Sequence, residues 1–175
     1  MSATTMGRWF IALHAELARR GVDADALFCA AGLNVATLQP TQSRVTLTQS
    51  RQIWDAAVDH TGDPALGLAV AQRASPGTFH ALAFAVLASA TLGQALERIV
   101  RYFRVVTDAA ELQLETHPDR LRLRIQVRTH DSAPADAAVD ALFAVLIQAA
   151  RTLLSPAFAP LALHLTRPAP ADLTP

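Results

Sequence analysis

Hydrophobic residues in the first 107 positions recur every three or four residues. This spacing gathers apolar side chains on one side of an α-helix. The first segment of this kind starts at Met6 and ends before Gly21. Two later segments start with a capping box, a threonine followed three residues later by a glutamine, at Thr46 and at Thr91. We therefore expect residues 1–107 to be helical.

One segment of this half is apolar on every side. It runs from Phe79 to Ala90 and carries no aspartate, glutamate, lysine or arginine. Its continuous apolar part, Ala81 to Ala88, is much shorter than the roughly 20 residues that span a bilayer. A helix without a polar face is buried on both sides. We expect a central helix with the core on one side and a cavity on the other, and no membrane segment.

The spacing of apolar residues changes to two in the second half of the chain. Apolar and polar residues alternate over residues 110–115 and again over residues 121–128, on either side of a proline–aspartate turn. This alternation is typical of a β-hairpin with one buried and one polar face. A turn centred on the proline and aspartate sets Glu115 opposite Arg122, which is a favourable cross-strand pair.

A further helix and a third strand are expected after the hairpin. Pro134 suits the first turn of a helix, and Pro156 suits a position just after its end. Leu161, Leu163 and Leu165 then alternate with other residues, which predicts a short strand.

The expected fold class is α+β. A helical N-terminal half, residues 1–107, is followed by a β-β-α-β half, residues 108–167, with a small antiparallel sheet. The proline-rich residues 168–175 are interpreted as a linker or a cut end.

Composition and charge narrow the class of protein. The 175 residues suit one domain, and 15 Lys+Arg balance 15 Asp+Glu, so the chain has no excess positive charge for nucleic acid or anionic lipid. Cys29 is the one cysteine, which excludes an internal disulfide and favours a reducing, cytoplasmic location. We expect its thiol to be buried.

Sequence motifs for catalysis are missing. The chain has no glycine-rich phosphate loop, no nucleophile elbow and no paired zinc-binding histidines on a helix. Its six histidines lack the spacing of metal ligands. We expect no enzyme activity, no bound metal and no cofactor.

Two interpretations of His80, in the apolar central helix, remain open. It is either a core histidine bonded to a backbone carbonyl or a polar group in a mostly apolar cavity, the usual make-up of a small-molecule site. In the second case Phe84 lies one turn further along the same side, Tyr102 closes the wall and Trp9 covers it from the first helix. We expect this pocket between the two halves, and a neutral or weakly acidic ligand with an apolar body.

Several short motifs then carry a family resemblance. "GDPALGL", "PGTF", "SATLGQAL", "RYFRVVTD" and "LQLE" follow one another in order. In this order they resemble the N-terminal effector domain of AraC/XylS-type transcriptional regulators. The resemblance covers most of residues 46–165.

This resemblance implies a small-molecule effector and a homodimer. Residues 1–167 would be the bacterial sensing and dimerisation domain, and DNA would be bound only by a separate C-terminal helix-turn-helix domain. Nothing after Leu165 resembles that part, so we expect a truncated regulator. The family commonly has glycine where this chain has His80, and a Gly-Tyr-like pair near Phe84, so the effector of a relative does not transfer.

A second resemblance rests only on the order of elements. Haem-binding H-NOX sensors also place a helical half before strands with an embedded helix. Their axial histidine follows the long central helix, whereas residues 102–115 here contain no histidine. The alternative of a haem or other cofactor-binding sensor is therefore the weaker of the two.

Overall fold

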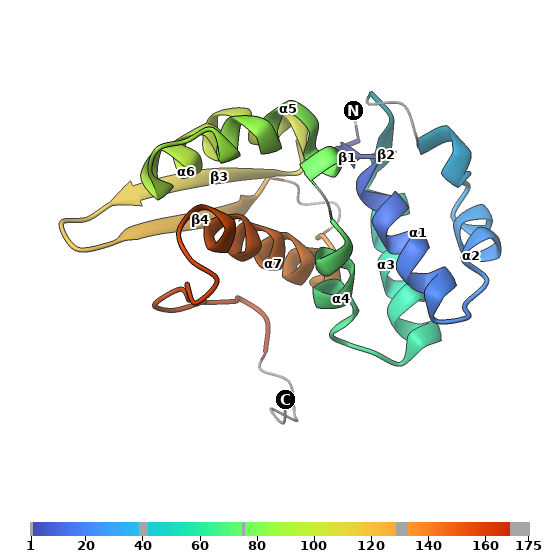
Figure 1. The fold of residues 1–175 in the computed structure, drawn as a ribbon. Coiled ribbons are helices and arrows are strands. Elements are labelled where there is room, and N and C mark those ends of the chain that lie inside the picture. The colour runs from blue at the N-terminus through green and yellow to red at the C-terminus, as the bar shows by residue number, and fades with distance from the viewer. Residues whose placement is uncertain (1, 39–41, 75, 129–132, 169–175) are drawn as a thin grey trace.

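The computed structural model describes residues 2–38, 42–74, 76–128 and 133–168, and Figure 1 shows the course of the chain. The α-helices and strands, in chain order, are β1 (Thr4–Met6), α1 (Trp9–Arg19), α2 (Ala24–Ala30), β2 (Arg44–Thr46), α3 (Leu47–Thr61), α4 (Leu66–Arg73), α5 (Pro76–Leu87), α6 (Leu92–Tyr102), β3 (Ala110–Thr116), β4 (Leu121–Val127) and α7 (Asp136–Leu153). Short 3₁₀ turns, η1 (Val35–Leu38) and η2 (Phe103–Val105), precede β2 and β3. The strands of the described part form two separate two-stranded antiparallel sheets. The α+β class is confirmed.

A first hydrophobic core lies among α1, α2, α3, α4 and the start of α7, at one end of the molecule (Figure 1). Its largest fully buried side chains are Trp54, Phe10, Phe28, Leu13 and Leu17. Helix α3 begins with the expected capping box, in which Thr46 Oγ1 accepts the Gln49 N–H and the Gln49 side chain accepts the Thr46 N–H. It ends at Gly62, which adopts the left-handed conformation with φ 62° that favours glycine.

A second core lies between the β-hairpin and helices α5, α6 and α7. The apolar residues of β3 and β4 face these helices, among them Ala110, Leu112, Leu123 and Ile125. The hairpin has the expected register, with Glu115 opposite Arg122 and their side chains 3.2 Å apart. None of the helices in the described part of the chain has the length and apolar character that crossing a bilayer requires.

The third strand expected at residues 161–165 is wrong. The segment belongs to no strand, and Leu161, Leu163 and Leu165 are exposed. Arg167 holds the end of this segment to Asp140 of α7 instead. Alternating leucines become a strand only where a free sheet edge lies within reach of their backbone.

Two short strands were not expected. Met6, placed in the first helix from its spacing, lies in β1 opposite Arg44 of β2, and α1 begins only at Trp9. A strand of three residues is too short to show the alternation by which strands are recognised. The backbone of β1 is fixed instead by a distant segment, since Met6 N–H donates to the Val106 carbonyl at 2.8 Å.

The central helix α5 is buried on one side only. Val86 points into the second core, whereas Phe84 is 65% exposed and Leu87 is 41% exposed. The expectation that both sides of this helix are covered is therefore wrong for the described structure.

Candidate functional site

The two cores meet at a joint made by β1, the start of α1, α5 and residues 106–108. Val106 packs against both cores. The rings of Trp9 in α1 and Phe79 in α5 lie 5.5 Å apart and tilted at 44°. The Trp9 ring therefore lies against the N-terminal part of α5 from the side of the first core.

Asp108 fixes the backbone at this joint. Its two carboxylate oxygens accept the N–H and the hydroxyl of Thr4, and Arg44 lies close enough to act on its charge. Burial acts to raise the pKa of Asp108, but the hydrogen bonds from Thr4 and the positive charge of Arg44 outweigh it, so the pKa lies below its usual value. The carboxylate therefore stays charged at neutral pH and ties β1 to the segment after α6.

Of the four candidate ligand-binding residues, the structure describes the side chains of three, and these have different surroundings. Trp9 is buried at the joint, while Phe84 and Tyr102 are exposed, Tyr102 by 47%. His80 belongs to α5, but its side chain lies outside the described residues. Phe79, the direct neighbour of His80 in sequence, contacts Trp9 through its ring.

Helix α4 connects the first core to α7. Gly67 lies so close to α7 that a Cβ at this position would overlap the backbone of Ala137. On its other side, Arg73 of α4 binds the buried Glu16 of α1. Gly67 falls within the "GDPALGL" motif. The motif therefore marked this glycine in the sequence, but it did not show that the glycine packs against α7.

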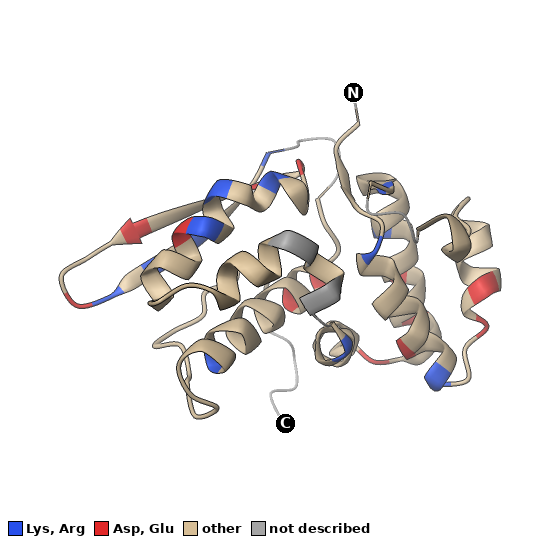
Figure 2. Ribbon diagram, turned by 45° about the horizontal axis from the view of Figure 1, so that its top comes forward, with Lys and Arg blue, Asp and Glu red and all other residues tan. Residues whose placement is uncertain are grey.

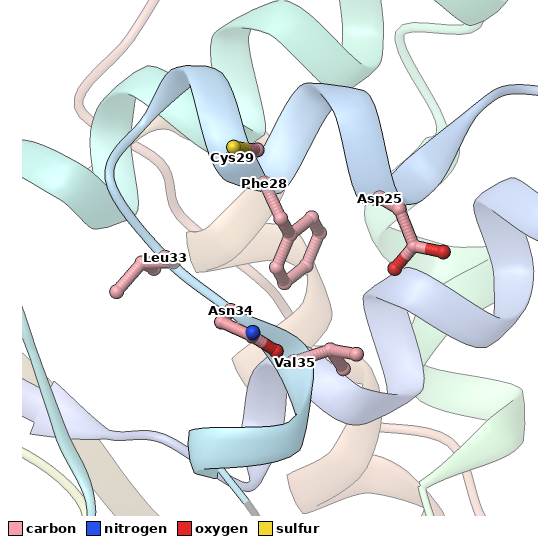
Figure 3. Close-up of a pocket in the computed structure, with 6 residues that line it drawn as sticks. All are labelled: Asp25, Phe28, Cys29, Leu33, Asn34 and Val35. Atoms are coloured by element: carbon pink, nitrogen blue, oxygen red, sulfur yellow. The ribbon is translucent and has the colours of Figure 1, made fainter.

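A small open pocket lies elsewhere, beside α2 (Figure 3). Its volume is about 240 Å³, below the usual range of roughly 300–1,000 Å³ for ligand pockets. The ring of Phe28 points into it between α2 and the turn that follows (Figure 3). The residues that line it are Asp25, Phe28, Cys29, Leu33, Asn34 and Val35.

The pocket beside α2 has few polar groups that could bind a ligand. His14 Nε2 lies 3.0 Å from Asp25 Oδ1, and Asn34 Oδ1 accepts the Ala36 N–H. Cys29 is exposed, so the expectation of a buried thiol is wrong. The sequence missed this pocket because a turn between two short helices forms it. Across the described part of the chain, histidine, cysteine and acidic side chains form no group of three or more that could hold a metal ion.

Comparison with known proteins identifies the family. Residues 21–175 match the model of the arabinose-binding N-terminal domain of AraC transcription regulators. A 108-residue stretch, 62% of this chain, is 36% identical to the ornithine utilization regulator of Pseudomonas aeruginosa and covers 32% of that protein. The match thus spans about a third of the relative's length. The chain belongs to the arabinose-binding N-terminal domains of AraC transcription regulators, a family of ligand-binding regulatory domains.

Proposed function

We propose that this chain senses a small molecule for a transcription regulator of the AraC type, and that it does so as a homodimer. The observation that carries the proposal is the family match over residues 21–175. DNA would be contacted by a separate helix-turn-helix domain of the same regulator. The two-core architecture supports a sensing role, because a molecule bound where the cores meet can change their relative position.

We place the effector at the joint between the cores. Trp9 and Phe79 supply an apolar lining there, and His80 follows Phe79 directly in the sequence. Phe84 and Tyr102, both exposed, would reach the effector only from the solvent side. An apolar surface with few polar groups suits a small molecule with an apolar body.

Thermal unfolding with candidate ligands tests the sensing role. L-arabinose and L-ornithine are the first probes because of the names of the matched family and relative, and a panel of neutral and weakly acidic metabolites follows. A ligand at about 100 times its Kd adds about 2.7 kcal/mol to the free energy of unfolding. For a chain of this size that raises Tm by about 5–10 °C. A panel that leaves Tm unchanged throughout would contradict the proposal.

His80→Gly tests the place of binding. Glycine inside a helix costs about 1 kcal/mol, so the variant should fold with a slightly lower Tm and lose the ligand-induced rise. Ala85→Gly is the matched control, because it weakens the same helix α5 and should keep the full ligand response. A folded His80→Gly protein that responds like the wild type removes His80 from the site. If it instead loses several kcal/mol of stability, with no ligand effect to lose, His80 is a core residue.

Two further measurements test the assembly. Sedimentation velocity of the wild type over a range of concentrations should show a monomer–dimer equilibrium. A gel shift at low salt should show no micromolar binding to duplex DNA, because 15 positive and 15 negative side chains leave no net charge to release counterions. A monomer at every concentration contradicts the proposed dimer. A shifted band at micromolar protein contradicts the expectation that this chain does not bind duplex DNA.

A further inference from the structure

Helix α7 has three faces, and the two cores use two of them. One face packs in the first core through Ala137, Ala138, Ala141 and Val145. A second face packs in the second core through Leu142, Leu146, Ala149 and Leu153. At 100° per residue the remaining face is the one that carries Val139, Phe143 and Ile147. We call these three residues, with the charged residues Asp136, Asp140 and Arg151 on the same side, the free face of α7.

The free face is apolar in the middle and charged at its ends. Asp136 and Asp140 lie near the start of α7 and Arg151 near its end, and no charged residue stands between Asp140 and Arg151. Figure 2 shows this distribution, with the coloured turns of α7 towards its two ends. Phe143 and Ile147 are only partly buried. The apolar residues of the free face are therefore neither fully buried in a core nor fully exposed to solvent.

The chain after α7 returns along this face. Near the end of the helix, Arg151 Nε donates to the Phe158 carbonyl at 3.0 Å. Near its start, Arg167 Nη2 donates to both carboxylate oxygens of Asp140 at 2.7 and 2.9 Å, and Arg167 Nη1 lies 3.9 Å from Asp136. The Asp140 side chain is only 14% exposed. Both ends of the returning segment are thus fastened to the free face by polar contacts.

The length of the segment fits this path. Residues 136 to 151 of a helix span about 22 Å, and the nine steps from residue 158 to residue 167 reach about 30 Å when extended. Between the fastened ends the segment buries little apolar surface, since Leu161 is 88% exposed and Leu163 is 49% exposed. Its attachment depends on a few polar contacts, with little help from packing.

We propose that residues 155–167 form a releasable strap that occupies the free face of α7 and keeps a second copy of the chain away from it. The Arg167–Asp140 pair is the latch of this strap. The inference rests on the homodimer of the proposed function and adds how its formation is controlled. The free face suits a second copy because, in an antiparallel pair of α7 helices, Asp136 at the start of one helix, whose charge is left intact by changes at Asp140, meets Arg151 of the other across the apolar middle.

Asp140→Asn in the full 175-residue chain tests the latch. The amide keeps the shape of the side chain and removes the charge that binds Arg167. We expect the ¹⁵N order parameters of the backbone of residues 158–167, measured by NMR relaxation, to fall, because the segment is then held to α7 at one end only. In sedimentation velocity we expect the dimer dissociation constant to fall at least about threefold, because the face is then open more of the time. Arg167→Gln should reproduce both effects from the other side of the latch.

Two further variants keep the result interpretable. Asp119→Asn also removes one carboxylate, which pairs with Arg120 at the hairpin turn, and should change neither measurement. Adding Phe143→Asp to Asp140→Asn should leave these order parameters low and cancel the gain in dimer.

Unchanged order parameters of residues 158–167 in the Asp140 variant overturn the latch. Lower order parameters with an unchanged dissociation constant overturn the claim that the strap keeps a second copy away. If the wild type dimerises and the variant does so equally well, the strap proposal is contradicted while the homodimer stands. If every variant stays monomeric, the homodimer of the proposed function is contradicted as well.

Discussion

The two cores of this chain differ in how completely they are built. The first core fully buries large residues, among them Phe10, Leu13 and Trp54, and it also encloses the carboxylate of Glu16. The second core has fewer buried residues, and most of the apolar side chains packed against it, such as Leu82 and Leu123, are only partly buried. Packing energy scales with apolar area removed from water. We therefore expect the first core to contribute most of the free energy of unfolding. A change in the packing of the second core should cost less free energy.

The largest expected effect is the loss of a large side chain from the first core. Leu13→Ala removes a fully buried leucine of α1, and we expect the free energy of unfolding to fall by about 2–5 kcal/mol through lost burial and a residual cavity. Leu87→Ala, at an exposed position of α5, is the control and should change it by less than about 0.5 kcal/mol. Urea unfolding measures both. Equal losses would mean that burial in the first core does not determine the cost of removing Leu13.

The contact between α4 and α7 should be the next most sensitive point. Gly67→Ala places a Cβ against the Ala137 backbone, which cannot swing aside as a side chain can. We expect a loss of about 1–3 kcal/mol from the enforced helix shift. Gly93→Ala is the matched control, because a Cβ there meets only ordinary contacts. Alanine should even stabilise that position slightly through its helix propensity, so thermal unfolding should show shifts of opposite sign.

The buried carboxylate of Glu16 gives a smaller effect with a pH dependence. Glu16 accepts hydrogen bonds from Arg19 at 2.7 Å and Arg20 at 2.7 Å, and also binds Arg73 of α4. Hydrogen bonds from Arg19 are the main cause that holds the pKa of Glu16 well below its usual range, against the opposing effect of burial. Glu16→Gln keeps the shape but loses the charge, and we expect a loss of about 2 kcal/mol at neutral pH.

The sign of the pH effect follows from the lowered pKa. Because the carboxylate holds its proton less tightly in the folded state, its stabilisation is complete above the ordinary pKa of 4.5 and is lost as the pH falls below that value. Thermal unfolding of the wild type should therefore lose more stability between pH 6 and pH 3 than that of Glu16→Gln. Parallel pH profiles would show that Glu16 does not contribute through its charge.

The comparison also explains which elements could be predicted from the sequence. The capping box at Thr46 and the pairing of Glu115 with Arg122 each depend on residues no more than seven positions apart in the sequence. The local sequence pattern was therefore enough to predict them. The strand expected at residues 161–165 failed because alternation says nothing about whether a partner edge is available. The joint depends on contacts such as Trp9 with Phe79, seventy residues away, for which one sequence carries no direct signal.

The site itself was predictable only in part. Trp9 was expected to cover a ligand pocket from the first helix; its ring lies against Phe79 of the central helix, and its place in a pocket stays a prediction. Phe84 and Tyr102 were expected in a cavity wall and are exposed. The sequence of a helix that is apolar on every side indicates which of its faces can be buried. It does not indicate whether neighbouring elements are present to cover each face.

The smallest expected effect compares two neighbours on α5. Val86 points into the second core and Phe84 into solvent, so Val86→Ala should cost about 1–2 kcal/mol. Phe84→Ser should change stability by no more than about 0.5 kcal/mol, since an exposed phenylalanine has little burial to lose and serine has a similar helix propensity. Urea unfolding of the two variants side by side gives the contrast. A large loss in Phe84→Ser would mean that a further surface, such as a second copy of the chain, covers this side of α5 in solution, and the second core would then be completed by assembly.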